Sequence, residues 1–138
     1  MSNKQKLIDG LNGDLNRELE AVLRYLYHAA TATSLLGHEL REVLKADLAG
    51  ELNHAVFLAD KISALGGEVK IQPAMPKKVR SAKQMLEENV AAERSVVASY
   101  TERIQQAEEF GDKGLVIRLE DILAEETDHA EELERLAR

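Results

Sequence analysis

The chain has 138 residues, of which 18 are Lys or Arg, 25 are Asp or Glu and none is Cys, giving a formal net charge of −7. The acidic balance argues against a nucleic-acid or anionic-membrane surface, and the lack of Cys excludes disulfides, thiolate nucleophiles and iron–sulfur ligation. Apolar residues make up 44% and aromatic residues 4% of the chain, a mixture that favours helices. The first residues lack the apolar stretch of a signal peptide, and no segment approaches about 20 uninterrupted apolar residues, which predicts a cytoplasmic protein without membrane contact.

Four helices are predicted, in chain order, from the residues that interrupt long apolar-periodic runs. Glycines follow the first three runs, and both prolines lie between the second run and the third. Ser81 and Gln84 have the spacing of a capping box at the start of the third helix. The interrupting residues are Gly37, Gly66, Gly67, Pro73, Pro76 and Gly111. The predicted helices cover residues 4–35, 38–65, 78–110 and 113–137.

The helices are predicted to form a bundle because each run carries apolar residues at alternating steps of three and four. The first and third connections are short, so each joins an antiparallel pair. The middle connection, residues 66–80, reaches about 40–50 Å if extended at about 3.3 Å per residue, which is enough to run the length of a bundle. We therefore predict a single all-α domain, residues 1–138, with two antiparallel helical hairpins joined by a long crossover.

A glutamate interrupts the apolar stripe near the middle of every predicted helix. An unpaired carboxylate buried in a bundle core costs several kcal/mol, so four of them require a counter-charge. Two histidines follow the second and fourth of these glutamates at i+3, which places each pair on one helical face. The residues are Glu18, Glu51, His54, Glu93, Glu126 and His129. Carboxylate and imidazole ligands suit iron, manganese or zinc.

The two halves of the chain repeat this pattern at an offset of 75 residues. The matched pairs are Glu18 with Glu93, Glu51 with Glu126, His54 with His129, and Tyr25 with Tyr100. Pairing the two hairpins about a pseudo-twofold axis brings four carboxylates and two imidazoles around one point. Two divalent ions would neutralise the four carboxylates, so the pattern predicts a dinuclear metal centre.

These residues resemble the ferritin-like di-iron carboxylate proteins, and among them bacterioferritin. The resembling stretches are residues 18–28, residues 51–55, Glu93 and residues 126–129. The resemblance implies that Glu51 and Glu126 bridge two iron ions, that Glu18 and His54 complete one metal shell, and that Glu93 and His129 complete the other. It also implies a ferroxidase that oxidises Fe(II) to Fe(III) with O2 or peroxide, for iron storage or detoxification.

Three further polar residues lie on the same helices. Tyr25 and Tyr100 follow their glutamates by seven residues and share their helical face. Two interpretations of them stay open: core packing with a satisfied hydroxyl, and a catalytic role as hydrogen-bond donor to a ligand or electron donor during oxygen reduction. For His28 we expect a packing or interface role, since it lies about 80° around the helix from Glu18.

Two positions depart from the bacterioferritin pattern. Leu52 stands where those proteins carry the haem-ligating Met, which argues against haem. The family often has an acidic residue directly before each Glu-x-x-His glutamate, as a partner of a ligand histidine; Glu125 fits this pattern and Gly50 does not. For Asp47 and Asp121, the other acidic candidates nearby, we favour in each case a solvated helix face over a partner role.

The expected assembly is a homodimer. The short fifth helix that helps to close the family's 24-subunit shell has no counterpart before Arg138, which favours a dimer over a cage. The first two helices also carry a second apolar stripe, for which a dimer interface and a wider core stripe are both open interpretations. The stripe includes Leu19, Leu23, Leu26, Leu48 and Leu52.

Two other functions use the same ligands. One is a rubrerythrin-like peroxide reductase, which here would need a separate electron donor because zero Cys excludes a rubredoxin module. The other is a non-catalytic bundle in which Zn or Mn neutralises the core glutamates. The residue pattern does not separate these functions from the ferroxidase.

Overall fold

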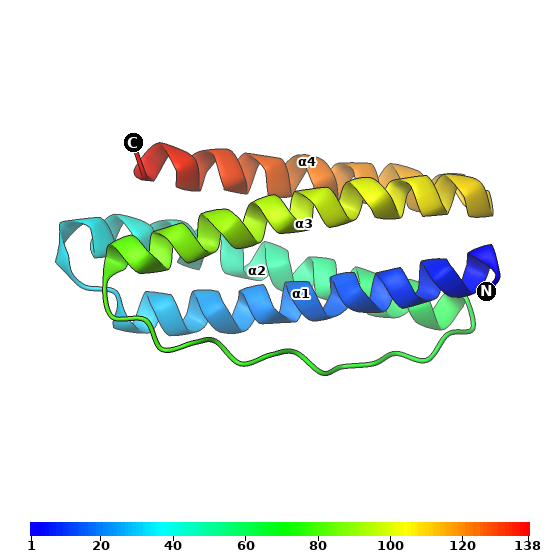
Figure 1. The fold of residues 1–138 in the computed structure, drawn as a ribbon, viewed down its shortest axis with the longest axis horizontal. Coiled ribbons are helices and arrows are strands. Elements are labelled where there is room, and N and C mark those ends of the chain that lie inside the picture. Colours follow the sequence, from blue (N-terminus) through cyan, green and yellow to red (C-terminus); the bar gives the residue numbers. More distant parts are fainter.

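The computed structural model describes all 138 residues and contains four long helices and no strands (Figure 1). The helices are α1 (Asn3–Thr31), α2 (Ser34–Ala64), α3 (Ala82–Phe110) and α4 (Lys113–Leu136). This confirms the predicted all-α bundle. None of the four is both long and apolar enough to cross a membrane.

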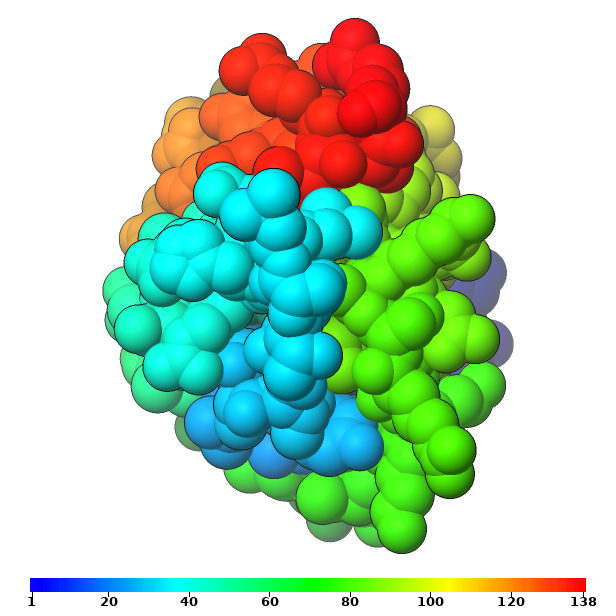
Figure 2. All heavy atoms as spheres, turned by 90° about the vertical axis from the view of Figure 1, so that its left-hand side faces the viewer, coloured from blue at the N-terminus to red at the C-terminus, as the bar shows by residue number.

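The helices form two antiparallel hairpins, α1–α2 and α3–α4, joined by a crossover that runs the length of the molecule (Figure 1). The backbone of α1 lies close to those of α2 and α3 but not to that of α4, so α1 and α4 lie diagonally across the bundle. The crossover, residues 65–81, returns the chain to the end at which α1 stops. Figure 2 shows this end, where the α1–α2 turn, the start of α3 and the last residues of α4 come together.

The boundary between α1 and α2 differs from the prediction. α1 ends at Thr31 rather than 35, and α2 begins at Ser34 rather than 38, so Gly37 lies inside a helix instead of after one. The chain reverses through Ser34, whose φ of 75° lies in the left-handed region. Gly37 packs against this link, because a Cβ there would lie 3.0 Å from the carbonyl carbon of Ala32. Its missing side chain therefore allows the tight turn.

The predicted cap of the third helix is present. The Ser81 hydroxyl accepts a hydrogen bond from the backbone amide of Gln84 at 3.1 Å. This bond satisfies one of the donors left free at a helix start. α3 accordingly begins at Ala82, later than the predicted start at 78, because residues 78–80 still belong to the extended crossover. At its other end Gly111 takes a φ of 93° as the C-cap.

Side chains of α1 hold the crossover through a ladder of hydrogen bonds to its backbone. The Asn12 amide donates to the Glu68 carbonyl at 2.9 Å and accepts from the Lys70 amide at 2.9 Å. Asn16 lies one turn later. Its side-chain amide donates to the Lys70 carbonyl at 2.7 Å and accepts from the backbone amide of Gln72 at 2.6 Å. Four helical residues rise about 6 Å and two extended residues about 6.6 Å, so the two periods match.

The apolar core consists of two clusters on either side of a polar layer. The larger cluster lies toward the start of α1 and the smaller toward its end. From α1, Leu7, Leu11 and Leu15 belong to the larger cluster and Ala21 and Tyr25 to the smaller. The gap between them falls at Glu18, so the fold buries carboxylates at mid-bundle.

Candidate metal centre

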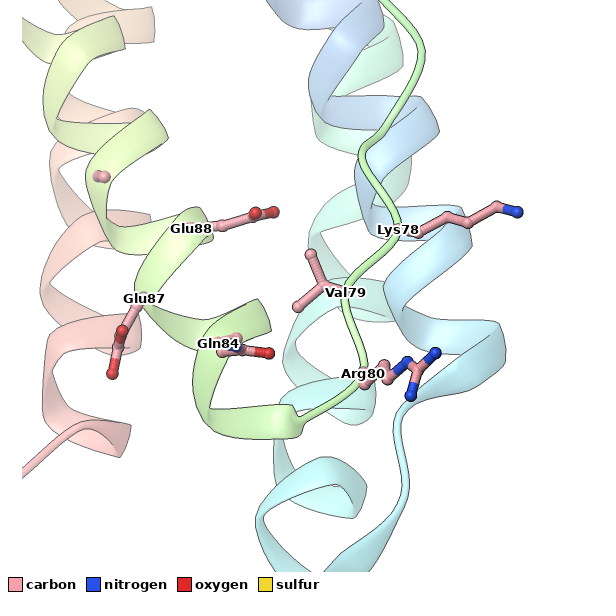
Figure 3. Close-up of a pocket in the computed structure, with 7 residues that line it drawn as sticks. Lys78, Val79, Arg80, Gln84, Glu87 and Glu88 are labelled. Carbon is pink, nitrogen blue, oxygen red and sulfur yellow. The ribbon is translucent and has the colours of Figure 1, made fainter.

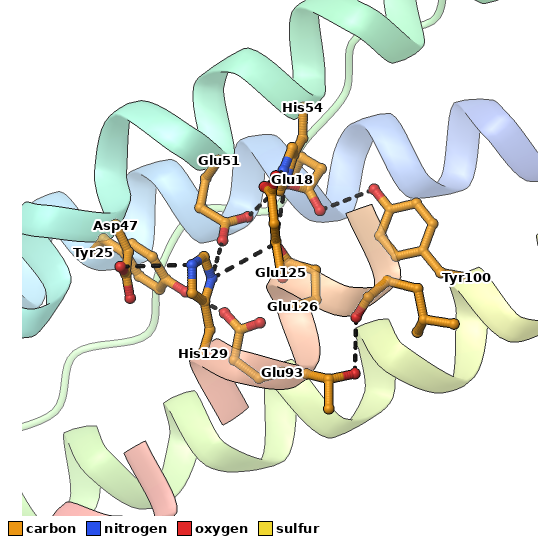
Figure 4. Close-up of polar contacts among 12 residues, drawn as sticks. Glu18, Tyr25, Asp47, Glu51, His54, Glu93, Tyr100, Glu125, Glu126 and His129 are labelled. Atoms are coloured by element: carbon orange, nitrogen blue, oxygen red, sulfur yellow. Dashed lines mark hydrogen bonds and ion pairs between the residues drawn. The ribbon is translucent and has the colours of Figure 1, made fainter. Parts of the chain in front are cut away.

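The polar residues that interrupt the four apolar stripes meet in one layer of the bundle (Figure 4). α1 and α3 each provide a glutamate, while α2 and α4 each provide a glutamate and a histidine one turn later. Five of the side chains are buried and the sixth, His129, is half-buried. They are Glu18, Glu51, His54, Glu93, Glu126 and His129, the six residues that the sequence pattern predicts as ligands. The structure therefore brings the whole predicted set together.

The donor atoms of these residues form two overlapping groups, within each of which they lie within 4.8 Å of one another. The first group is Glu18, Glu51, His54 and Glu126, and the second is Glu51, Glu93, Glu126 and His129. Glu51 and Glu126 belong to both groups. This is the geometry expected of two metal positions that share two carboxylates.

Both histidines turn the same ring nitrogen toward the centre. His54 Nδ1 lies 3.2 Å from a carboxylate oxygen of Glu18 and 3.1 Å from one of Glu126. His129 Nδ1 lies 2.9 Å from Glu51 Oε1. Nε2 of each ring therefore faces outward, and a neutral imidazole with its proton on Nε2 presents the Nδ1 lone pair to a cation.

Each tyrosine hydroxyl donates a hydrogen bond across the bundle to a glutamate of the other hairpin. Tyr25 bonds to Glu93 Oε1, and Tyr100 bonds to Glu18 Oε1 at 3.0 Å. Burial and the nearby carboxylates raise the pKa of both phenols well above the usual value. The hydroxyls therefore keep their protons and orient the two glutamates that belong to one group only.

The electrostatics of the layer are those of four carboxyl groups too close together for all to be ionised without cations. Burial raises the pKa of Glu93 to about 9 and that of Glu126 to about 8, and it raises the pKa of Glu18 well above the usual value. Burial acts to raise the pKa of Glu51 too, but hydrogen bonds with Glu18 and His129 outweigh it and lower this pKa. The metal-free layer therefore retains protons.

Unpartnered oxygens show that the layer fits cations. Glu51 Oε2, Glu93 Oε2 and both carboxylate oxygens of Glu126 are buried and make no hydrogen bond. A buried polar atom without a partner costs about 1–3 kcal/mol, so four in one layer are costly unless they bind something. Carboxylate oxygens and imidazole nitrogens in this combination suit iron, manganese or zinc.

Two further carboxylates lie behind the histidines (Figure 4). Glu125 Oε2 lies 2.5 Å from His54 Nε2, as expected from its place before Glu126. Asp47 Oδ1 lies 3.5 Å from His129 Nε2, and its side chain is only 15% exposed. The prediction of a solvated helix face is therefore wrong for Asp47, because α4 packs over it, while Asp121 is exposed as predicted. Burial raises the pKa of Asp47 to about 6.

Two polar pairs that flank the tyrosines were not predicted from the sequence. Arg103 Nε donates to Asp14 Oδ2 at 2.7 Å, and His28 Nδ1 accepts from the Asn89 amide at 2.9 Å. The offset of 75 residues that relates the ligands also relates Asp14 to Asn89 and His28 to Arg103. This repeat of polar residues could have predicted that the four positions are buried in the bundle. His28 is fully buried, as a packing role requires, and burial lowers its pKa to about 4.

A surface hollow of about 630 Å³ lies between the end of the crossover and the first turns of α3 (Figure 3). Its lining residues are Lys78, Val79, Arg80, Gln84, Glu87, Glu88 and Ala91. Lys78 and Arg80 project away from α3, so the polar groups do not converge on a ligand position. The mid-bundle layer is therefore the candidate functional site.

Comparison with known sequences identifies one matching family and two bacterioferritins as relatives. The profile of the family described as "Ferritin-like domain" matches residues 8–138. A bacterioferritin of Brucella melitensis biotype 1 is 27% identical over 135 residues, covering 97% of this chain and 84% of that protein. A bacterioferritin of Mycobacterium leprae is 28% identical over 125 residues, covering 90% and 79%.

Comparison with solved structures gives the same result. A ferritin-like di-iron carboxylate protein of Bacillus anthracis is 36% identical, with a TM-score of 0.95 and complete coverage of both chains. The bacterioferritin of Desulfovibrio desulfuricans is 25% identical, with a TM-score of 0.82 and coverage of 97% of this chain and 79% of that one. A dodecameric thioferritin of Bacteroides fragilis, at 24% identity and a TM-score of 0.88, covers 97% and 85% and shows the fold alone.

Proposed function

The chain belongs to the ferritin-like family, and on that basis we propose that it is a di-iron ferroxidase of the bacterioferritin type. It binds two Fe(II) ions and passes their electrons to O2 or peroxide, for iron storage or detoxification. The observation that carries the proposal is the pair of overlapping donor groups that share Glu51 and Glu126, with buried oxygens that lack partners. Zn or Mn would fit the same donors.

The proposed reaction balances without a further co-reactant. Two Fe(II) ions give up two electrons, which with two protons convert O2 to H2O2, or H2O2 to two waters. A pair of irons held by shared carboxylates supplies both electrons at one place. In this proposal the carboxyl groups of Glu93 and Glu126 release their protons when the ions bind, and the tyrosine hydroxyls fix the carboxylates at the two unshared positions.

The proposed ligand roles correspond to the two donor groups. Glu51 and Glu126 would be shared by both ions, Glu18 and His54 would complete one position, and Glu93 and His129 would complete the other. The six donors come from a single chain, so the proposed centre does not require a partner subunit.

The proposal includes assembly as a homodimer through α1 and α2. Leu26, Leu52 and Val56 are 58%, 48% and 54% exposed, which is unusual for large apolar side chains. They continue the apolar stripe of Leu19, Leu23 and Leu48, which are partly buried.

An anaerobic Fe(II) titration followed by exposure to O2 tests the proposed function. We expect saturation at two irons per chain and near-UV ferric absorbance that rises faster than in buffer alone. The double variant E51A/E126A should abolish both signals, and the control E42A/E120A, with exposed glutamates of the same two helices, should retain them. Saturation at two ions without faster oxidation would instead favour the non-catalytic bundle, and oxidation only with peroxide and an added electron donor would favour a peroxide reductase.

A further inference from the structure

The two histidines of the centre have outer carboxylates at positions that the internal repeat does not relate. Glu125 contacts Nε2 of His54 from the position directly before Glu126. The repeat places Gly50 at the matching position behind His129, so the second histidine lacks that partner. Asp47, one helical turn before Glu51, contacts Nε2 of His129 instead.

We infer that Asp47 is the positioning residue of His129. It supplies the outer carboxylate that the repeat would place at residue 50, and it does so from a different turn of α2. The inference rests on the proposed metal centre. A carboxylate at Nε2 keeps the ring proton on that nitrogen and leaves the Nδ1 lone pair directed at the ligand position. His129 Nδ1 already faces Glu51, one of the shared carboxylates, at 2.9 Å.

The surroundings of Asp47 leave it free for this task. Its Oδ2 is buried and makes no hydrogen bond, so no other donor competes for the carboxylate. The 3.5 Å contact to Nε2 is longer than the 2.5 Å contact of Glu125, so a hydrogen bond at this position requires the two side chains to move closer by a few tenths of an ångström. Asp47 and Glu51 are four residues apart and therefore face α4 from the same side of α2.

Position 50 provides an internal means of rescue. No atom other than the helix's own backbone and chain neighbours lies within 4 Å of a Cβ built on Gly50. A glutamate there has room and, by the repeat, would approach His129 Nε2 as Glu125 approaches His54. The variant Gly50→Glu can therefore restore an outer carboxylate that Asp47→Ala removes.

Binding of Co(II), followed under anaerobic conditions by its visible absorption and by calorimetry, tests the inference without any turnover. Wild type should bind two ions per chain. In D47A the affinity for one ion should fall about 10- to 100-fold while the other is retained. D47N keeps an oxygen acceptor without the charge and should lie between wild type and D47A. D47A/G50E should recover the lost affinity. D47A/G50A raises helix propensity at position 50 without adding a carboxylate, and it should not recover the affinity.

The outcomes separate this inference from the proposed function. A wild-type chain that fails to bind two ions contradicts the metal centre itself. Two ions bound with equal affinity by wild type, D47N and D47A would leave the centre intact and overturn the role of Asp47. A D47A/G50E variant that binds no better than D47A/G50A would also overturn it. Far-UV circular dichroism of each metal-free variant checks that the fold is retained.

Discussion

The buried protons of individual glutamates govern how the metal-free protein responds to pH. The pKa values of Glu93 and Glu126, about 9 and about 8, exceed the ordinary value of 4.5. Between pH 4.5 and these values the folded chain holds protons that the unfolded chain has released. Their contribution to stability is therefore complete below pH 4.5 and is lost as the pH rises through 8 and 9.

We accordingly expect the Tm of the metal-free protein to fall by at least about 5 °C between pH 7 and 9.5, as measured by calorimetry. E93Q removes one titrating group and should flatten this dependence. Saturation with Zn(II) should flatten it too, because the cation replaces the protons. Parallel pH profiles for metal-free wild type and E93Q would contradict the raised pKa of Glu93.

At the scale of elements, the crossover is held by side chains rather than by a core of its own. Asn16 lies at the centre of the ladder, between Asn12 and Glu20, whose carboxylate accepts from the Ala74 backbone amide at 2.9 Å, and Asn16 bonds to the Lys70 carbonyl and the Gln72 backbone amide. N16A leaves both backbone groups without this partner, so we expect the free energy of unfolding to fall by about 1–2 kcal/mol. Q5A, which removes an exposed side-chain bond to Asp9 on the same helix, is the matched control.

Urea unfolding measures the loss of stability, and limited trypsin digestion locates it. We expect cleavage after Lys70 to be faster in N16A than in wild type or Q5A. If N16A is less stable but is cleaved no faster at Lys70, Asn16 acts through α1 and not through the crossover.

The helices were largely predictable because their apolar periods and caps are local signals. The Ser81 cap and the crossover length were readable in this way, but the start of α2 was not. A glycine after a helix and a glycine inside one look the same in sequence, and only the close approach of Ala32 to Gly37 distinguishes them. The contacts of Asn12 and Asn16 with the crossover were likewise not predictable, because their partners are backbone groups, which have no sequence signature.

The candidate site was predictable where the repeat preserves it. The six glutamates and histidines recur at one offset, and the structure brings them into one layer. The repeat gives no support for a role of Asp47, because its repeat mate is Ile122, and the favoured prediction for this candidate was a solvated helix face. In the proposed role, Asp47 replaces a partner that is missing at Gly50, and it lies on another helical turn. It therefore falls outside the 75-residue repeat by which the six ligands are recognised.

At the scale of the whole molecule, the metal centre and the proposed dimer interface use different faces of the same helices. Glu18 and Glu51 point into the bundle, whereas Leu26 and Leu52 are exposed. We therefore expect the proposed assembly and the proposed metal binding to be separable by mutation.

The variant L52E tests this separation. In the proposed dimer, a carboxylate at position 52 would be buried against an apolar partner surface without a counter-charge, at a cost of several kcal/mol. We expect light scattering to report two chains per particle for wild type and one for L52E. I117E places the same charge on an equally exposed apolar residue of α4 and should remain dimeric. Because one chain supplies all six donors, L52E should still bind two Co(II) ions. An unchanged particle mass in L52E would place the interface elsewhere, and loss of metal together with assembly would mean that the centre depends on the partner after all.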